Sequence, residues 1–124
     1  MYKKIILAFL FTFTSFSLLA SINSDAPRFE NIKVKEVNLT GVKSVEEVHM
    51  RLFHSLDFPF YYGHNLDALW DVLTEKDLNQ VLLKITVDDE FDKLDKRFLD
   101  QFLSILEELR SVHQDFTFNF KIEY

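Results

Sequence analysis

YYGHNLDALWD, running from Tyr61 to Asp71, carries the strongest structural signal in this sequence. Gly63 allows the backbone to turn where a residue with a Cβ atom is strained. Asn65 is a residue type that caps helices, because its side chain accepts a hydrogen bond from an amide of the first turn. The segment therefore predicts a turn followed by a helix that begins near Leu66 and continues to about Glu75.

The predicted helix has one apolar side and an acidic flank. Asp67 and Asp71 are four residues apart, so both project from the same flank, next to Trp70. Two like charges at this spacing repel by roughly 0.2–0.5 kcal/mol on a helix surface, and a cationic partner offsets that cost. Two solvated aspartates satisfy the same pattern, so the residues alone leave both interpretations open. The apolar side is formed by Leu66, Leu69, Trp70 and Leu73.

The whole string, YYG followed by NLDALWD at a fixed offset, resembles the signature of the barstar family, the small protein inhibitors of barnase-type ribonucleases. The resemblance is densest from Pro59 to Leu73. It extends more weakly, as a matching order of elements, from about Ile32 to the C-terminus. It implies a non-enzymatic α/β protein with a barstar-like three-stranded parallel sheet.

Hydrophobic periodicity predicts the same architecture. The order strand, two helices, strand, helix, strand implies parallel strands joined by right-handed crossovers. The run over residues 81–87 is almost entirely apolar and β-branched, which favours a central strand, whereas the last strand alternates and belongs at an edge. This one-sided alternation predicts helices packed mainly on one face of the sheet. The predicted elements are a strand over residues 32–39 that ends at Thr40-Gly41, a helix from a Ser44/Glu47 capping box to Asp57, the motif helix, a strand over residues 81–87, a helix from about Lys96 and a strand over residues 116–122.

The same patterns predict which residues are buried and which are exposed to solvent. The acidic run Asp88-Asp89-Glu90 is predicted as a solvated loop or a helix start. His49 lies near the apolar face of the first helix and is interpreted as a partly buried packing residue, since no second histidine or cysteine stands at metal-ligand spacing. Apolar positions assigned to the first strand are Ile32, Val34, Val37 and Leu39, and those assigned to the long helix are Phe98, Phe102, Ile105, Leu109 and Val112, flanked by Leu99 and Leu106.

Composition describes one compact acidic domain. The 124 residues are 48% hydrophobic with two glycines, two prolines and a net charge of −6. The sequence contains neither a basic stripe nor a glycine-rich phosphate loop, so direct nucleic-acid binding is disfavoured and a basic protein partner is favoured. We expect a monomer until that partner binds.

The first twenty residues have the layout of a signal peptide. Lys3 and Lys4 precede an uncharged run from Ile5 to Leu19, and cleavage is expected after Ala20. An uncleaved membrane anchor is the alternative, but the segment is short for a full span and contains several hydroxyl side chains. The predicted organisation is a signal peptide over residues 1–20, a polar tether over residues 21–31 and a domain over residues 32–124.

The predicted location is therefore periplasmic or secreted, with membrane anchoring as the alternative. The chain has no cysteine, so it forms no disulfide in an oxidising compartment. The familiar family member acts inside the cell that makes the ribonuclease. Either this member guards the periplasm, or the hydrophobic leader does something other than direct export.

The resemblance also implies a set of contact residues. Tyr61 matches an aromatic residue that packs onto the ribonuclease active site, Asp67 and Trp70 match contact residues, and Asp71 matches the carboxylate that occupies the phosphate position. Glu108 falls where the family has another acidic contact. A carboxylate that accepts paired hydrogen bonds from arginine is a reasonable substitute for a phosphate in any case.

Two positions depart from the family's pattern. His64 stands where the best-known member has glutamate, and Val112 stands where that member has a further acidic residue at the rim. Charges at a rim mostly tune association rate and partner choice, so these changes concern the target more than the fold.

The residues do not favour a metal site or a nucleophilic enzyme. His64, Asp67 and Asp71 lack the further ligands that a divalent metal site needs, so neither a metal nor another cofactor is expected. A nucleophilic enzyme is disfavoured because the chain has no cysteine and no serine in a glycine-rich elbow. The remaining alternatives are a barstar-like envelope protein that binds a different protein partner and, less favoured, a small envelope enzyme that uses His64 or Asp67.

Overall fold

A computed structural model describes residues 31–123. The predicted signal peptide and nearly all of the predicted tether therefore lie outside the described residues. Within them, no helix is both long and apolar enough to cross a lipid bilayer. The elements are β1 (Lys33–Asn38), α2 (Val45–Ser55), α3 (Leu66–Glu75), β2 (Val81–Val87), α4 (Asp89–Asp92), α5 (Lys96–Val112) and β3 (Thr117–Ile122).

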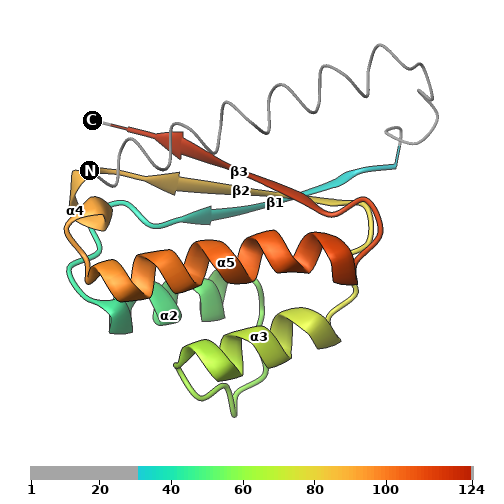
Figure 1. The fold of residues 1–124 in the computed structure, drawn as a ribbon, viewed down its shortest axis with the longest axis horizontal. Coiled ribbons are helices and arrows are strands. Elements are labelled where there is room, and N and C mark those ends of the chain that lie inside the picture. The colour runs from blue at the N-terminus through green and yellow to red at the C-terminus, as the bar shows by residue number, and fades with distance from the viewer. Residues whose placement is uncertain (1–30, 124) are drawn as a thin grey trace.

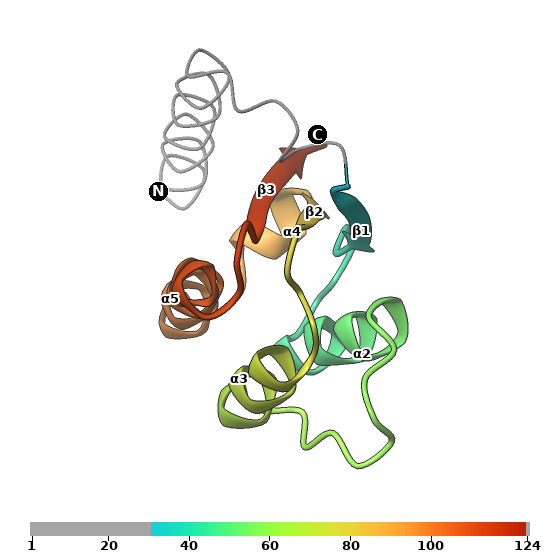
Figure 2. The ribbon, with the colours of Figure 1, turned by 90° about the vertical axis from the view of Figure 1, so that its right-hand side faces the viewer.

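The three strands form one parallel sheet in the order β1-β2-β3, so the apolar run of β2 is central as predicted. Helices α2, α3 and α5 all lie on one side of the sheet (Figures 1 and 2). The residues that face the helices form rows across the three strands. One such row consists of Val37, Ile85 and Phe120, all of which are buried. The predicted α/β class, with a parallel sheet and helices mainly on one face, is confirmed.

One position predicted to be in the core, Val34, lies on the open face of the sheet, the face that the three helices do not cover. Val34 pairs in register with Leu82, on the face that α2, α3 and α5 do not cover, and its side chain is 54% exposed. The parallel register places Val37 on the opposite face, where it is buried. Val34 is therefore not a core residue. The prediction was wrong because the loose alternation of the first strand does not show which face Val34 occupies.

The helix ends follow the capping signals in the sequence. The Ser44 hydroxyl accepts a hydrogen bond from the Glu47 amide over 3.2 Å, and the Glu47 carboxylate accepts one from the Lys43 amide over 3.1 Å. The Asp95 carboxylate caps α5 in the same way. At the other end of α5, the prediction that Val112 belongs to the apolar stripe is wrong, because its side chain is 46% exposed, whereas the next residue, His113, is buried.

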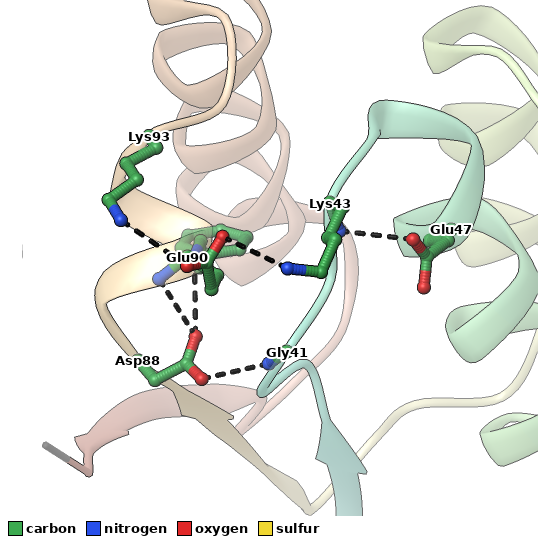
Figure 3. A network of polar contacts seen from close by, with 7 residues as sticks. Gly41, Lys43, Glu47, Asp88, Glu90 and Lys93 are labelled. Atoms are coloured by element: carbon green, nitrogen blue, oxygen red, sulfur yellow. Dashed lines mark hydrogen bonds and ion pairs between the residues drawn. The ribbon is translucent and has the colours of Figure 1, made fainter.

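Asp88 joins two loops at the carboxyl end of the sheet. One carboxylate oxygen accepts hydrogen bonds from the Glu90 and Phe91 amides and starts α4, and the other accepts one from the Gly41 amide over 2.8 Å (Figure 3). Gly41 has a φ of +75°, a conformation that favours glycine. The ion pairs of Glu90 with Lys43 and Lys93 are exposed and contribute little. The acidic run predicted as a loop or helix start is therefore a capped helical turn.

Replacing Asp88 with alanine tests this junction. The substitution removes a helix cap and a link to the loop before α2, so we expect the free energy of unfolding to fall by about 2 kcal/mol. Urea unfolding measures it. Asp100→Ala removes an exposed carboxylate from α5 and serves as the control, with an expected change within about 0.5 kcal/mol. Equal losses in the two variants contradict the assignment.

Candidate functional site

The turn before α3 is held by the side chain of Asn65. Its oxygen accepts a hydrogen bond from the Ala68 amide over 2.8 Å, and its nitrogen donates one to the Gly63 carbonyl over 3.2 Å. The predicted cap is confirmed, but the role predicted for Gly63 is not. The residue with positive φ is His64, at 54°, whereas a Cβ on Gly63 would lie 3.3 Å from the Asn65 side-chain nitrogen. Glycine at position 63 thus leaves room for the cap, because a Cβ there would make tight contacts with the Asn65 and Ala68 side chains.

Helix α3 is the element farthest from the sheet and packs against α5 (Figures 1 and 2). Leu69, Val72 and Leu73 are buried beneath it, while Leu66 and Trp70 are only partly buried. The motif helix therefore presents its acidic flank to solvent, with Trp70 at the boundary between core and surface.

A groove of about 440 Å³ runs between α3 and α5. It brings together four of the five predicted site residues, three of which are exposed carboxylates. Among the described residues, no hydrogen bond or ion pair engages the side chains of Asp67, Asp71 and Glu108. Such a groove can accept hydrogen bonds from several cationic groups at once. Its lining is Leu66, Asp67, Trp70, Asp71, Gln101, Ser104, Ile105 and Glu108.

His113 positions the two walls of this groove. Its side chain is buried, and Nε2 lies 2.7 Å from the Leu73 carbonyl near the end of α3. Its own amide donates to the Leu109 carbonyl at the end of α5. One residue thus ties the last turns of α3 and α5 together. Sequence reasoning missed it, because a lone histidine after a helix carries no pattern that indicates such a contact.

Tyr61, the fifth predicted site residue, lies outside the groove. It belongs to a turn in which the Tyr62 amide donates to the Pro59 carbonyl over 3.0 Å. The two central residues of the turn, Phe60 and Tyr61, are exposed, whereas Tyr62 is buried. The paired tyrosines of the motif therefore differ in role: Tyr61 is available to a partner and Tyr62 anchors the turn.

Tyr62 meets a buried histidine. Its hydroxyl and Nδ1 of His49 share a hydrogen bond, and His49 is 1% exposed, which corrects the prediction of partial burial. Burial lowers the pKa of His49, the nearby His64 lowers it further, and Glu46 acts in the opposite direction. Burial likewise raises the pKa of Tyr62. The His49–Tyr62 contact therefore anchors the turn that presents Tyr61 in the core.

His64 faces away from the groove. Its Nδ1 lies 3.8 Å from a carboxylate oxygen of Glu46, and its ring packs near those of Tyr62 and His49. Within residues 31–123 there is no group of three or more His, Asp or Glu side chains placed to hold a metal ion.

Comparisons with known proteins identify relatives of this chain. The family model described as Barstar (barnase inhibitor) matches residues 32–124. A Bacillus subtilis (strain 168) protein named "Putative ribonuclease inhibitor YrdF" is 59% identical over 32 residues, which cover 26% of this chain and 35% of that protein. The match thus spans about a third of that relative's length.

The buried histidine makes stability depend on pH. In the unfolded chain His49 titrates near the ordinary histidine pKa of about 6.5, and in the folded protein its pKa is lower. The unfolded state therefore binds the proton first, so stability falls as pH drops below about 6.5, by up to about 1.4 kcal/mol per pH unit, until the lowered pKa is passed. Urea unfolding between pH 8 and pH 5 measures this.

The matched variants are His49→Gln and His54→Gln. Glutamine keeps a polar group near Tyr62 but does not titrate, so its stability profile is expected to be flatter between pH 6.5 and 5. His54 is exposed, and its replacement is expected to keep the original slope. An unchanged slope in the His49 variant contradicts the assignment.

Proposed function

The chain belongs to the barstar family, and from that membership we propose that it is a protein inhibitor of a barnase-type ribonuclease. One observation carries the proposal: carboxylates from α3 and α5 line a single groove, and no side chain of the described residues pairs with them. Like charges that share one groove repel one another, and a cationic partner removes that repulsion. The proposed partner supplies the missing cations.

The proposed inhibition is a blockade and involves no chemistry by this chain. A ribonuclease holds a phosphodiester with arginine, lysine and histidine side chains, and Asp71 presents a carboxylate to the same groups. Asp67 and Glu108 extend the negative charge along the groove, and Trp70 supplies an apolar surface beside them. Tyr61 packs at the edge of the enzyme's site from the neighbouring turn.

The two departures from the family's pattern fit this proposal. The side chain of His64 is 26% exposed and lies next to Glu46, so it adds no charge inside the groove. Val112 is exposed beyond the groove lining. Both changes reduce negative charge at the edge, and we propose that they slow association and shift the preference among barnase-type ribonucleases, while the central contacts still bind barnase itself.

We also propose that the inhibitor acts in the periplasm or after secretion. This proposal is supported by the leader pattern alone, in which two lysines precede an uncharged run that ends in Leu18-Leu19-Ala20. The full sequence has a net charge of −6, and loss of Lys3 and Lys4 with the leader makes the charge more negative, which suits encounter with a basic nuclease.

Replacing Asp71 tests the inhibition. The protein purified from cells that express the full-length sequence is titrated against barnase with a fluorogenic RNA substrate. Asp71→Ala is expected to weaken inhibition by roughly 2–5 kcal/mol, the range for truncating one member of a buried ion pair, for which the barnase–barstar complex is itself a reference case. The loss is expected to shrink as salt rises, because ions screen the pair.

Glu36→Gln is the matched control, since it removes one exposed carboxylate from β1 on the open face of the sheet, away from the groove. We expect inhibition within about twofold of the unmodified protein. Equal effects of the two substitutions contradict the proposed site. Absence of inhibition by the unmodified protein at micromolar concentration overturns the proposed function and favours another protein partner.

Processing at the leader is tested by N-terminal sequencing. Protein recovered from the periplasmic fraction of expressing bacteria is expected to begin at Ser21. A chain that keeps Met1 and sediments with membranes supports anchoring instead, and an unprocessed cytosolic protein contradicts export.

A further inference from the structure

Phe60 is the most exposed large apolar side chain of the described residues, at 91%. The other phenylalanines between residues 31 and 123 are buried or partly buried. A fully exposed ring contributes no burial energy to folding, so the stability of the free protein does not explain it. Position 60 is also not among the residues to which the barstar resemblance assigns a contact.

The turn that carries Phe60 is held by a hydrogen bond across it and by buried side chains on either side. Pro59 and Tyr62 are joined by a hydrogen bond across it. On either side of the turn, Phe58 and Tyr62 are 4% and 5% exposed, and their ring centroids are 4.8 Å apart. Both ends of the turn are therefore anchored in the core, and Phe60 projects from a fixed base.

Phe60 and Tyr61 form one aromatic protrusion. Their ring centroids are 5.7 Å apart in an edge arrangement, which is a favourable geometry for aromatic pairs. Binding such a preformed pair costs little conformational entropy, since the backbone is already ordered. The protrusion ends four residues before Asn65, the cap of α3, so it lies close along the chain to the acidic flank.

We propose that Phe60 inserts into an apolar pocket beside the cationic cleft of the ribonuclease partner, and so determines which basic nucleases this protein binds. The proposal rests on the proposed function and deepens it. The partner must combine two features: cations that meet Asp71 and an apolar recess within reach of the turn. A nuclease with only the cations is expected to bind more weakly.

The charge around Phe60 favours a basic protein partner over an anionic membrane or a second copy of this chain. The segment from residue 52 to residue 75 contains Asp57, Asp67, Asp71 and Glu75 but no lysine or arginine. An anionic membrane surface repels such a segment. A second copy of this chain, with a net charge of −6, is repelled as well. A basic protein is attracted, and its apolar recess accounts for the exposed ring.

The experiment compares two contacts of different physical kind, with barnase as the probe. Phe60→Ser is expected to weaken binding roughly 10- to 100-fold, mainly through faster dissociation, and by the same factor at low and high salt. The loss from Asp71→Asn is expected to decrease as salt rises. Phe60→Tyr keeps a ring and is expected to bind within about threefold of the unmodified protein.

Val34→Ser is the matched control, because Val34 is also an exposed apolar residue but lies on the open face of the sheet. It is expected to leave affinity unchanged. Because Phe60 is exposed, its serine variant is expected to keep the urea midpoint of the unmodified protein, which excludes misfolding as the cause of weaker binding.

The outcomes separate this inference from the proposed function. If Asp71→Asn weakens binding and Phe60→Ser does not, the inference fails and the inhibitor proposal stands. If the unmodified protein does not bind barnase, the proposed function fails and this inference fails with it. If Phe60→Ser abolishes a dimer in light scattering, or abolishes binding to phosphatidylglycerol vesicles, the ring serves a second copy or a membrane and the inference is overturned.

Discussion

The Asn65 side chain bonds to both sides of the turn before α3, and the positions of the site residues follow from that contact. Its oxygen fixes the first residue of the helix through the Ala68 amide, and its nitrogen holds the Gly63 carbonyl. The start of a helix sets the direction in which each later side chain projects. Asp67 and Asp71 therefore share one flank, and the turn that bears Phe60 and Tyr61 is held at a defined distance from it.

The layered arrangement explains why this helix is available to a partner. The sheet is covered on one face by α2 and α5, and α3 packs farther out, against α5 (Figure 2). Its buried residues complete the core, and its exposed Asp67 and Asp71 line the groove that it forms with α5. His113 closes the far end by contacting the Leu73 carbonyl. The groove is thus built between two regular elements, which hold side chains more precisely than loops do.

The groove and the protrusion supply two different forces. Carboxylates in the groove attract a basic partner over distance and lose strength in salt, whereas the exposed ring of Phe60 acts only on contact and is insensitive to salt. In the free protein neither feature stabilises the fold, since the like charges repel one another and the apolar ring is exposed to water. The core beneath the sheet, where residues such as Leu69 and Ile85 are fully buried, offsets them.

Local patterns in the sequence determined the order of the elements, the caps at Ser44 and Asn65 and the acidic flank of the motif helix, because each depends on residues within one or two turns. Only the tertiary structure decided which positions face which neighbour. Val34 and Val112 match the apolar pattern yet are exposed, and His113 matches no pattern yet joins two helices. The placement of Glu108 in the same groove as Asp71 was also decided by the tertiary structure, because it depends on how α5 packs against α3, two helices far apart in the chain.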